Sequence, residues 1–249
     1  MQHEFSFLFH PVNALLIALL GEPSARWRTA MGIPLEEAAW LPDHVIMSIL
    51  VVVLVAVVLL AARRRYSMER PSTLQQVLEL LVSGLRSMTE DVVGHGRGRD
   101  FVPFIAALAF FIFLANIFGL LFFLAPPTAN TNTTFALSIT AFLFYNAVGI
   151  KRQGVIRYAK HFAGPVWWLF PLMVPLEIIS HLARVLSLAL RLFGNIFAEH
   201  TATGIFMAMV PFVVPWGMMG MGILGATIQT FIFIMLTAVY IAGAVAEEH

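Results

Sequence analysis

One arginine stands in a part of the chain that is otherwise apolar enough to lie in a membrane. Arg191 falls within the segment Leu188–His200, which reads LALRLFGNIFAEH. A guanidinium group keeps its positive charge in any protein environment, and placing it at mid-membrane depth costs at least about 2.5–3.5 kcal/mol. A membrane sequence tolerates that cost where the charge has a partner or a task. We expect Arg191 to face a mobile carboxylate on a partner protein and to govern proton transfer there.

The polar residues of the C-terminal third recur at helical spacing. Glu177, Arg184 and Arg191 lie seven residues apart, and on a helix of 3.6 residues per turn each such step returns to within about 20° of the same direction. Neighbouring polar residues lie close enough along the chain to border this face. One side of the helix is therefore predicted to be polar along most of its length. The residues that we assign to it or to its border are Glu177, His181, Arg184, Ser187, Arg191, Asn195, Glu199 and His200.

The two arginines of this face allow different interpretations. Arg184 could form an internal ion pair with Glu177 or His181 at helical spacing, or extend to the membrane interface. Arg191 has no acidic residue three or four positions away, and Glu199 lies two turns further on and about 80° around the helix. A cation without a local partner implies an external one.

A glutamine is the main polar side chain of the last apolar segment. Gly222 and Gly225 precede Gln229 by seven and four residues and share its helical face. Small residues allow two helices to approach closely, and a glutamine can hydrogen-bond across the contact. We expect Gln229 to face the Arg191 side. An ordinary packing face with one polar link is the alternative.

The composition indicates an integral membrane protein. Of 249 residues, 59% are hydrophobic and 12% are charged, whereas a soluble domain carries about 25% charged residues. The formal net charge of +1 gives no indication of a nucleic-acid partner. The lack of cysteine excludes disulfides, thiolate metal sites and cysteine nucleophiles. We expect no cofactor and no metal, and the lack of a P-loop or nucleophile motif excludes a soluble hydrolase in practice.

Long apolar segments predict an all-α membrane protein with about five spanning helices. Each segment is long enough to cross a hydrocarbon core of about 30 Å. The fourth would measure about 69 Å as one straight helix, so it must tilt strongly, bend at Pro171 or Pro175, or lie partly in the interface. Pro211, Pro215 and Gly217 are expected to break it. The predicted spans are 44–62, 101–124, 132–150, 165–210 and 217–246.

The remaining residues are predicted to lie at the membrane surfaces. Residues 71–93 carry apolar side chains at three- and four-residue spacing, which predicts an amphipathic helix on the membrane or on a partner. The following run Gly94–Arg99, GHGRGR, is expected to be a solvated linker and not a phosphate-binding loop. Residues 1–43 lack the basic start of a signal peptide. We expect them to form an outer or interfacial arm ahead of a single membrane domain, 44–249.

Clusters of basic residues predict the orientation of the chain. Arg63–Arg65 follows the first span and Lys151–Lys160 contains four basic residues after the third, so the positive-inside rule places both clusters in the cytoplasm. The N-terminus is then outside, and the amphipathic helix and the C-terminus are cytoplasmic. Glu177 lies on the inner side of Arg191, and Glu199 lies on the outer side. Titratable groups on both sides of a permanent charge suit two half-paths for protons.

Two segments carry a resemblance to a known family. Ser187–His200, SLALRLFGNIFAEH, resembles the hallmark of subunit a of rotary F-type ATP synthases, and Ile228–Leu236, IQTFIFIML, resembles its terminal helix. Leu114–Gly119 (LANIFG) and Pro127–Thr134 (PTANTNTT) are weaker matches. The resemblance covers about residues 40–249. It implies five spanning helices, a cytoplasmic amphipathic helix, and a long tilted C-terminal hairpin against a ring of c subunits.

The resemblance also implies roles for individual residues. The family's essential arginine corresponds to Arg191, its inner acid to Glu177, its polar neighbour to Asn195, its outer acid or histidine to His200, and its terminal-helix glutamine to Gln229. We add His181 and Glu199 to the proton path, with Arg184, Ser187 and Asn116, the one strongly polar residue of the second span, in support.

The chain departs from the family at one position of the last helix. Gly222 stands where many members carry histidine or glutamate. The outer path of this chain cannot use that side chain. We hypothesise that Glu199, beside His200, compensates for it.

The implied partners are the c-subunit ring, b-type peripheral stalk subunits, the rest of the F-type ATP synthase and the lipid bilayer of a bacterial inner membrane. The chain would be a proton-translocating subunit with no ATP chemistry of its own. The alternative is a standalone proton or ion transporter that conducts when purified alone. A purely structural membrane anchor would leave Arg191 unexplained.

Overall fold

The computed structural model describes residues 8–34, 39–64, 66–68, 71–120, 126–154, 170–209 and 214–245. Within these residues every regular element is helical, and five helices are long and apolar enough to cross a membrane. The predicted all-α membrane fold is therefore confirmed. Parts of the expectations lie outside the described residues, namely 1–7, Arg65, 121–125, 155–169, 210–211 and the last four residues.

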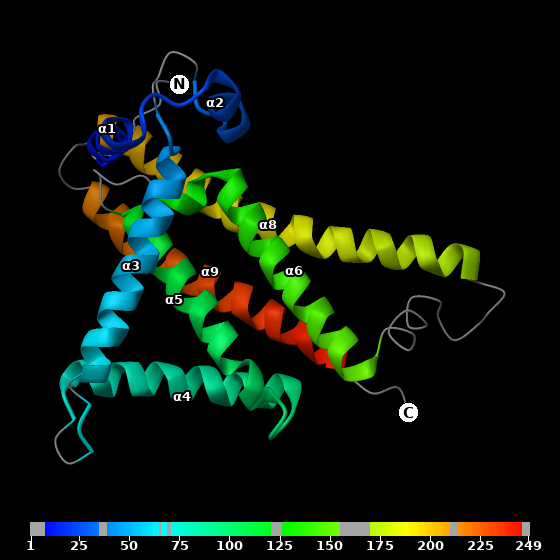
Figure 1. Cartoon of the computed structure of the whole chain (residues 1–249). Coiled ribbons are helices and arrows are strands. Elements are labelled where there is room, and N and C mark those ends of the chain that lie inside the picture. Colours follow the sequence, from blue (N-terminus) through cyan, green and yellow to red (C-terminus); the bar gives the residue numbers. More distant parts are fainter. Residues whose placement is uncertain are drawn as a thin grey trace.

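The helices form a bundle with a separate N-terminal arm. Figure 1 shows α3 running from two short N-terminal helices at one end to the surface helix α4 at the other. Helix α4 packs on α5 and α9, and α6 packs on α8 and α9. The elements are α1 (Phe9–Leu20), α2 (Ala25–Met31), α3 (Asp43–Arg64), α4 (Thr73–Val93), η1 (Gly98–Phe101), α5 (Val102–Phe118), η2 (Pro127–Ala129), α6 (Thr131–Gln153), α8 (Phe170–Met209) and α9 (Val214–Val245).

Local sequence signals set the ends of α4 and α6. The Ser72 hydroxyl accepts a hydrogen bond from the Gln75 backbone N–H at the start of α4, and the Asn130 side chain does the same for Asn132 at the start of α6. Such caps satisfy backbone donors that have no partner inside the helix. Helix α6 ends at Gln153 and is capped by Gly154, whose φ of 80° is a conformation that glycine adopts readily.

The basic run after α4 is more ordered than a solvated linker. Gly98 is buried and begins η1, which packs against α4. A Cβ atom at Gly98 would lie 2.8 Å from the backbone oxygen of Thr89. The linker interpretation is therefore wrong at this residue, because the absence of a side chain lets the backbone rest directly on α4.

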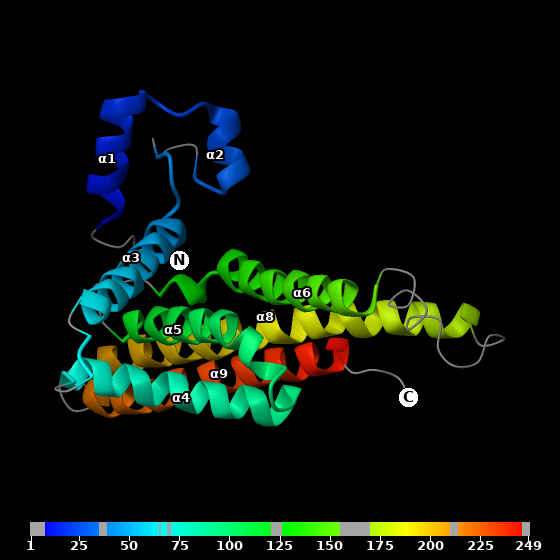
Figure 2. The same ribbon diagram turned by 60° about the horizontal axis from the view of Figure 1, so that its bottom comes forward.

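The two C-terminal helices form a long hairpin. Helices α8 and α9 run side by side in opposite directions in both views (Figures 1 and 2). Helix α8 ends at Met209 and α9 begins at Val214, so the predicted boundary between the two helices is present, but Pro215 lies after it, within the start of α9. Proline is tolerated in a first turn, where its missing N–H would have no helical partner. Helix α8 passes through Pro175 as one element and at about 1.5 Å per residue measures about 60 Å.

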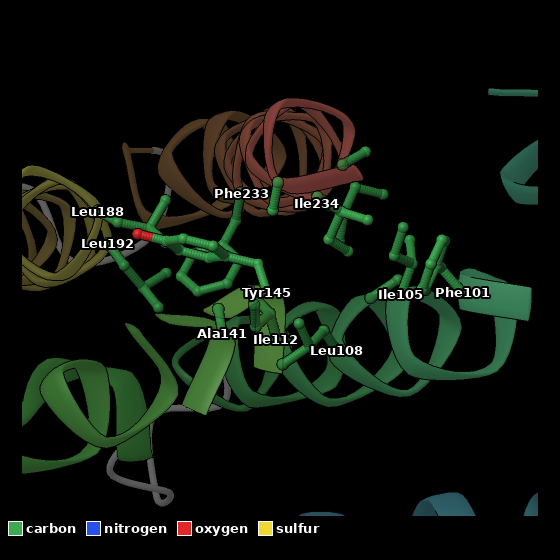
Figure 3. Packing of buried hydrophobic residues seen from close by; sticks show 14 of the residues in the cluster. Phe101, Ile105, Leu108, Ile112, Ala141, Tyr145, Leu188, Leu192, Phe233 and Ile234 are labelled. Atoms are coloured by element: carbon green, nitrogen blue, oxygen red, sulfur yellow. The ribbon is translucent and has the colours of Figure 1, made fainter. Parts of the chain in front are cut away.

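The core lies where α5, α6, α8 and α9 meet (Figure 3). Tyr145 extends from α6 into this core, with its hydroxyl directed toward α8 and its ring near Phe233 of α9. Packing in this core places α8 next to α6 and α9, so that polar side chains of α8 can contact both helices. The buried residues of the core include Ile105, Leu108 and Ile112 of α5, Ala141 and Tyr145 of α6, Leu188 and Leu192 of α8, and Phe233, Ile234, Ala238 and Ile241 of α9.

Candidate functional site

Arg191 lies at the edge of the buried face of α8. Leu188 and Leu192 beside it are buried against the core, whereas Leu190 is exposed and Arg191 itself is half-buried. Among the residues that the structure describes, none forms an ion pair or hydrogen bond with the Arg191 guanidinium. The charge is thus held at a helix surface, where a group from outside the chain can reach it.

A buried histidine lies between a carboxylate and a tyrosine toward the N-terminal end of α8. His181 Nε2 is 3.3 Å from Glu177 Oε1, and His181 Nδ1 is 2.8 Å from the hydroxyl of Tyr145 on α6. His181 is 7% exposed, and Tyr145 is 2% exposed. The Glu177 side chain is 31% exposed, so the carboxylate remains accessible. Sequence reasoning found Glu177 and His181 but missed Tyr145.

Arg184 takes neither of the ion-pair partners that we considered from the sequence. Its guanidinium lies over the Tyr240 ring of α9, 5.3 Å from the ring centroid, while His181 pairs with Glu177. A cation over an aromatic face is stabilised by about 0.5–2 kcal/mol. Ser187 is exposed and donates its hydroxyl to the backbone oxygen of Arg184 within the same helix. Neither Arg184 nor Ser187 therefore forms an ion pair or hydrogen bond with the described Glu177–His181 pair: Arg184 packs on α9, and Ser187 bonds within α8.

One turn beyond Arg191, α8 is tied to α9 by two carboxamides. Asn195 Nδ2 donates a hydrogen bond of 2.6 Å to Gln229 Oε1. Gln229 is 1% exposed and its Nε2 atom has no hydrogen-bond partner among the described residues, whereas Asn195 is exposed. Gln229 therefore contacts the turn of α8 that follows Arg191.

The carboxylate of Glu199 occupies a notch in α9 that two glycines create. A Cβ atom built on Gly222 would overlap Glu199 Oε1 and the end of the Leu120 side chain. A Cβ atom on Gly225 would lie 3.4 Å from Glu199 Oε2, an ordinary contact. The space that a side chain at position 222 would fill is thus taken by a carboxylate from α8.

A cavity of about 130 Å³ adjoins this carboxylate. This exceeds the roughly 10–15 Å³ that one water molecule needs, so water can enter it. Asn116 of α5, Glu199 and the exposed His200 of α8 supply polar groups to its wall. Its other lining residues are Gly119, Leu120, Pro126, Ile196, Thr203, Gly204 and Met219.

A buried threonine orients the Asn116 side chain. The Thr128 hydroxyl of η2 donates a 2.8 Å hydrogen bond to Asn116 Oδ1. Asn116 is 2% exposed, and its Nδ2 atom has no hydrogen-bond partner among the described residues. An unpartnered buried donor is costly unless water reaches it, so this amide suits a wetted cavity. Thr128 was missed from the sequence, although it lies in the PTANTNTT segment.

The candidate site therefore consists of Arg191 with one polar group on each side of it along α8, the Glu177 group and the Glu199 group. At about 1.5 Å per residue, Glu177 lies about 21 Å before Arg191 along α8 and Glu199 lies about 12 Å after it. Each group contains a carboxylate that can accept and release a proton. Within the described residues, no cluster of three or more histidines or acidic residues could hold a metal ion.

Comparisons with known proteins place the chain in a family. Residues 45–242 match the family model described as ATP synthase A chain. ATP synthase subunit a 2 of Syntrophotalea carbinolica is 47% identical over 207 residues, which cover 83% of this chain and 87% of the relative. ATP synthase subunit a of Trichlorobacter lovleyi is 48% identical over 179 residues, covering 72% and 77%. The protein of the same name from Geobacter sulfurreducens is 45% identical over 179 residues, with the same coverage.

Proposed function

The chain belongs to the ATP synthase A chain family, and we propose that it is the proton-conducting stator subunit of a rotary F-type ATP synthase. The observation that carries this proposal is the state of Arg191. Its charge is half-buried on α8, has no ionic partner among the described residues, and lies between two carboxylate-containing groups. A cation placed in this way suits a carboxylate that arrives on a separate, moving subunit.

The proposed cycle moves protons and makes no covalent bond. A proton enters from outside through the cavity beside Glu199 and neutralises a carboxylate of the c-ring, which can then turn into lipid without the cost of a bare charge. After nearly a full revolution the carboxyl reaches Arg191, which stabilises its ionised form, and the proton leaves past Glu177. Each charge moved gains about 2.3 kcal/mol per 100 mV.

Arg191 also separates the two half-paths. A proton that passed directly from the Glu199 side to the Glu177 side would have to cross the neighbourhood of a permanent positive charge, which is electrostatically unfavourable. Protons therefore travel with the ring, and ring rotation stays coupled to their flow.

The outer half-path uses Glu199 in place of a side chain at position 222. The overlap of a Gly222 Cβ atom with the Glu199 carboxylate supports this, because the same volume then holds an acid supplied by α8. Asn116, His200 and water in the cavity would bring the proton to that acid. The Asn195–Gln229 hydrogen bond holds the two helices together between the cavity and Arg191.

The c-ring would pack against the exposed apolar surface of the hairpin. Side chains of both helices contribute to it, including Leu186, Leu190, Ile228 and Phe231. Because Arg191 lies beside this surface, a ring carboxylate can reach it from the lipid side. We assign b-type peripheral stalk subunits and the remainder of the synthase as further partners.

The same proposal orients the chain in a bacterial inner membrane. The exposed Arg63 and Arg64 at the end of α3, and Lys151 and Arg152 at the end of α6, mark the cytoplasmic side by the positive-inside rule. Residues 1–43 then form an outer or interfacial arm, residues 44–249 the membrane domain, and the C-terminus is cytoplasmic.

Reconstitution with and without the ring tests the function against the standalone-transporter alternative. We expect the chain to co-purify with a ring of small hairpin proteins and to conduct protons in vesicles only when that ring is present. Proton flux through the purified chain alone, equal to that of the assembled membrane sector, would refute the stator function.

A further inference from the structure

Three side chains from two helices lie in series on the proposed exit side of Arg191, linked by one hydrogen bond and one ion-pair contact. The Tyr145 hydroxyl lies 2.8 Å from His181 Nδ1, and His181 Nε2 lies 3.3 Å from Glu177 Oε1. Tyr145 belongs to the buried core, whereas the Glu177 carboxylate is partly exposed. These contacts therefore connect the buried core of the bundle to Glu177, the acid that receives the departing proton in the proposed cycle.

The imidazole ring is restrained by aromatic contacts on two sides. Tyr145 stacks on His181 with ring centroids 5.9 Å apart and planes 23° apart. Phe142, one turn earlier on α6, meets the same ring edge-on at 6.0 Å and 78°. With the ring plane held in this way, the state of His181 that matters is which nitrogen carries the hydrogen.

The contacts with Glu177 and Tyr145 fit one tautomer of a neutral His181. An ionised carboxylate only accepts hydrogen bonds, and a neutral imidazole offers one donor and one acceptor. A neutral His181 that turns an N–H toward an ionised Glu177 carries its hydrogen on Nε2, which leaves Nδ1 as the acceptor. In that tautomer the Tyr145 hydroxyl, 2.8 Å from Nδ1, is the donor to it and stabilises the Nε2–H form.

We propose that Tyr145 is a positioning residue of the exit path, which acts by holding His181 as an Nε2–H donor that orients the Glu177 carboxylate. This inference rests on the proposed function. A proton that arrives on Glu177 turns the carboxylate into a carboxyl, whose O–H cannot point at a nitrogen that already bears a hydrogen. The carboxyl then releases its proton to the cytoplasmic water, and the regenerated carboxylate returns to the Nε2–H group.

The Tyr145→Phe variant tests this role because it keeps the ring and removes the hydroxyl. Passive proton conductance is measured in vesicles that hold the complete membrane sector, with the pH varied on the cytoplasmic side. Among the described residues, His181 contacts the titratable groups of Glu177 and Tyr145. Tyr145 in turn contacts Tyr240, over whose ring Arg184 lies. We expect conductance to fall about fivefold to tenfold, the effect of one lost hydrogen bond, and its dependence on cytoplasmic pH to shift.

Tyr240→Phe is the matched control. Tyr240 packs against Tyr145 and carries Arg184 over its ring, but its hydroxyl has no hydrogen bond among the described residues. We expect wild-type conductance and an unshifted pH profile. Equal behaviour of the two phenylalanine variants would overturn the positioning role of Tyr145.

Variants of His181 supply a second test that does not depend on the folding of Tyr145→Phe. Glutamine can both accept from Tyr145 and donate to Glu177, so His181→Gln should conduct at least about threefold better than His181→Leu. In the His181→Leu background, Tyr145→Phe should have almost no further effect, because the residue through which Tyr145 acts is gone. Equal conductance of the glutamine and leucine variants, or multiplying effects in the double variant, would overturn the inference.

Failure of this inference can be told apart from failure of the proposed function. If the wild-type sector conducts and Arg191→Lys abolishes coupling, while Tyr145→Phe behaves as wild type, the inference alone is wrong. If the wild-type sector does not conduct with the ring present, the stator function itself is wrong.

Discussion

A single methyl group at position 222 is predicted to displace the Glu199 carboxylate from its notch. The Gly222→Ala Cβ atom would overlap Glu199 Oε1 and Leu120 Cδ2, both of which are the ends of flexible side chains. The helices can therefore stay in place while the carboxylate moves. Alanine also favours a helix over glycine by about 1 kcal/mol, so we expect the variant to assemble at wild-type levels.

The size of the functional effect follows from the cost of overpacking. Inserting a methyl group into a filled site costs about 1–3 kcal/mol. If that cost falls on the conformation with the Glu199 carboxylate in the notch, the fraction of molecules in that conformation drops about 5-fold to 150-fold, since about 1.4 kcal/mol is a factor of ten. Proton uptake through the outer half-path should fall toward the level of Glu199→Gln, which removes the acid and keeps the side-chain shape.

Passive proton conductance of the membrane sector in vesicles is the assay, with Gly225→Ala as the matched control. Its Cβ atom would lie 3.4 Å from Glu199 Oε2, so it makes an ordinary contact and should conduct as wild type. Combining Gly222→Ala with Glu199→Asp withdraws the carboxylate by one methylene and should restore part of the conductance. Wild-type conductance in either Gly222→Ala or Glu199→Gln would refute the role of the notch.

Two further variants test the packing around the site. Thr128→Val removes the donor to buried Asn116 and should lower the free energy of unfolding by about 1–3 kcal/mol. The control Thr140→Val, at an exposed helix position, should change it by less than about 0.5 kcal/mol. Thermal unfolding in detergent compares the two variants, and equal shifts would contradict the burial argument. Asp100→Asn breaks an exposed ion pair with Arg152 and should leave the unfolding temperature unchanged within error; a large decrease would show that this pair fixes the end of α6.

The sequence was sufficient to predict the helices and the polar side of α8. Long apolar runs specify spanning helices because backbone groups in a membrane must be hydrogen-bonded internally. The seven-residue spacing of Glu177, Arg184 and Arg191 places them on one face whatever the rest of the fold. Pro215 was misread because a proline signals a helix boundary without telling whether the helix ends before it or begins around it.

The contacts between helices could not be predicted from spacing. Tyr145 and His181 are 36 residues apart, and their hydrogen bond depends on the relative rotation and register of α6 and α8. A tyrosine in an apolar span was the available signal, because a buried hydroxyl usually has a partner. Arg184 was expected beside an acid or at the interface, whereas an aromatic ring from α9 takes that place.

For Glu199 and Gly222, the sequence predicted related roles but not the contact between them. The glycine and the nearby acid were both visible in the sequence, and their complementary roles could be hypothesised. That the carboxylate occupies the volume above the glycine depends on how closely α8 and α9 approach. Only the packed hairpin supplies that distance.

The role of Arg191 is tested most directly by ATP synthesis in inverted vesicles that carry Arg191→Lys. Lysine keeps a positive charge but loses the planar fork and can be deprotonated. Arg184→Lys is the control, because a lysine can also lie over the Tyr240 ring. We predict background ATP synthesis for Arg191→Lys and near wild-type synthesis for Arg184→Lys. Wild-type synthesis by Arg191→Lys would contradict the assignment of Arg191 as the divider of two proton half-paths.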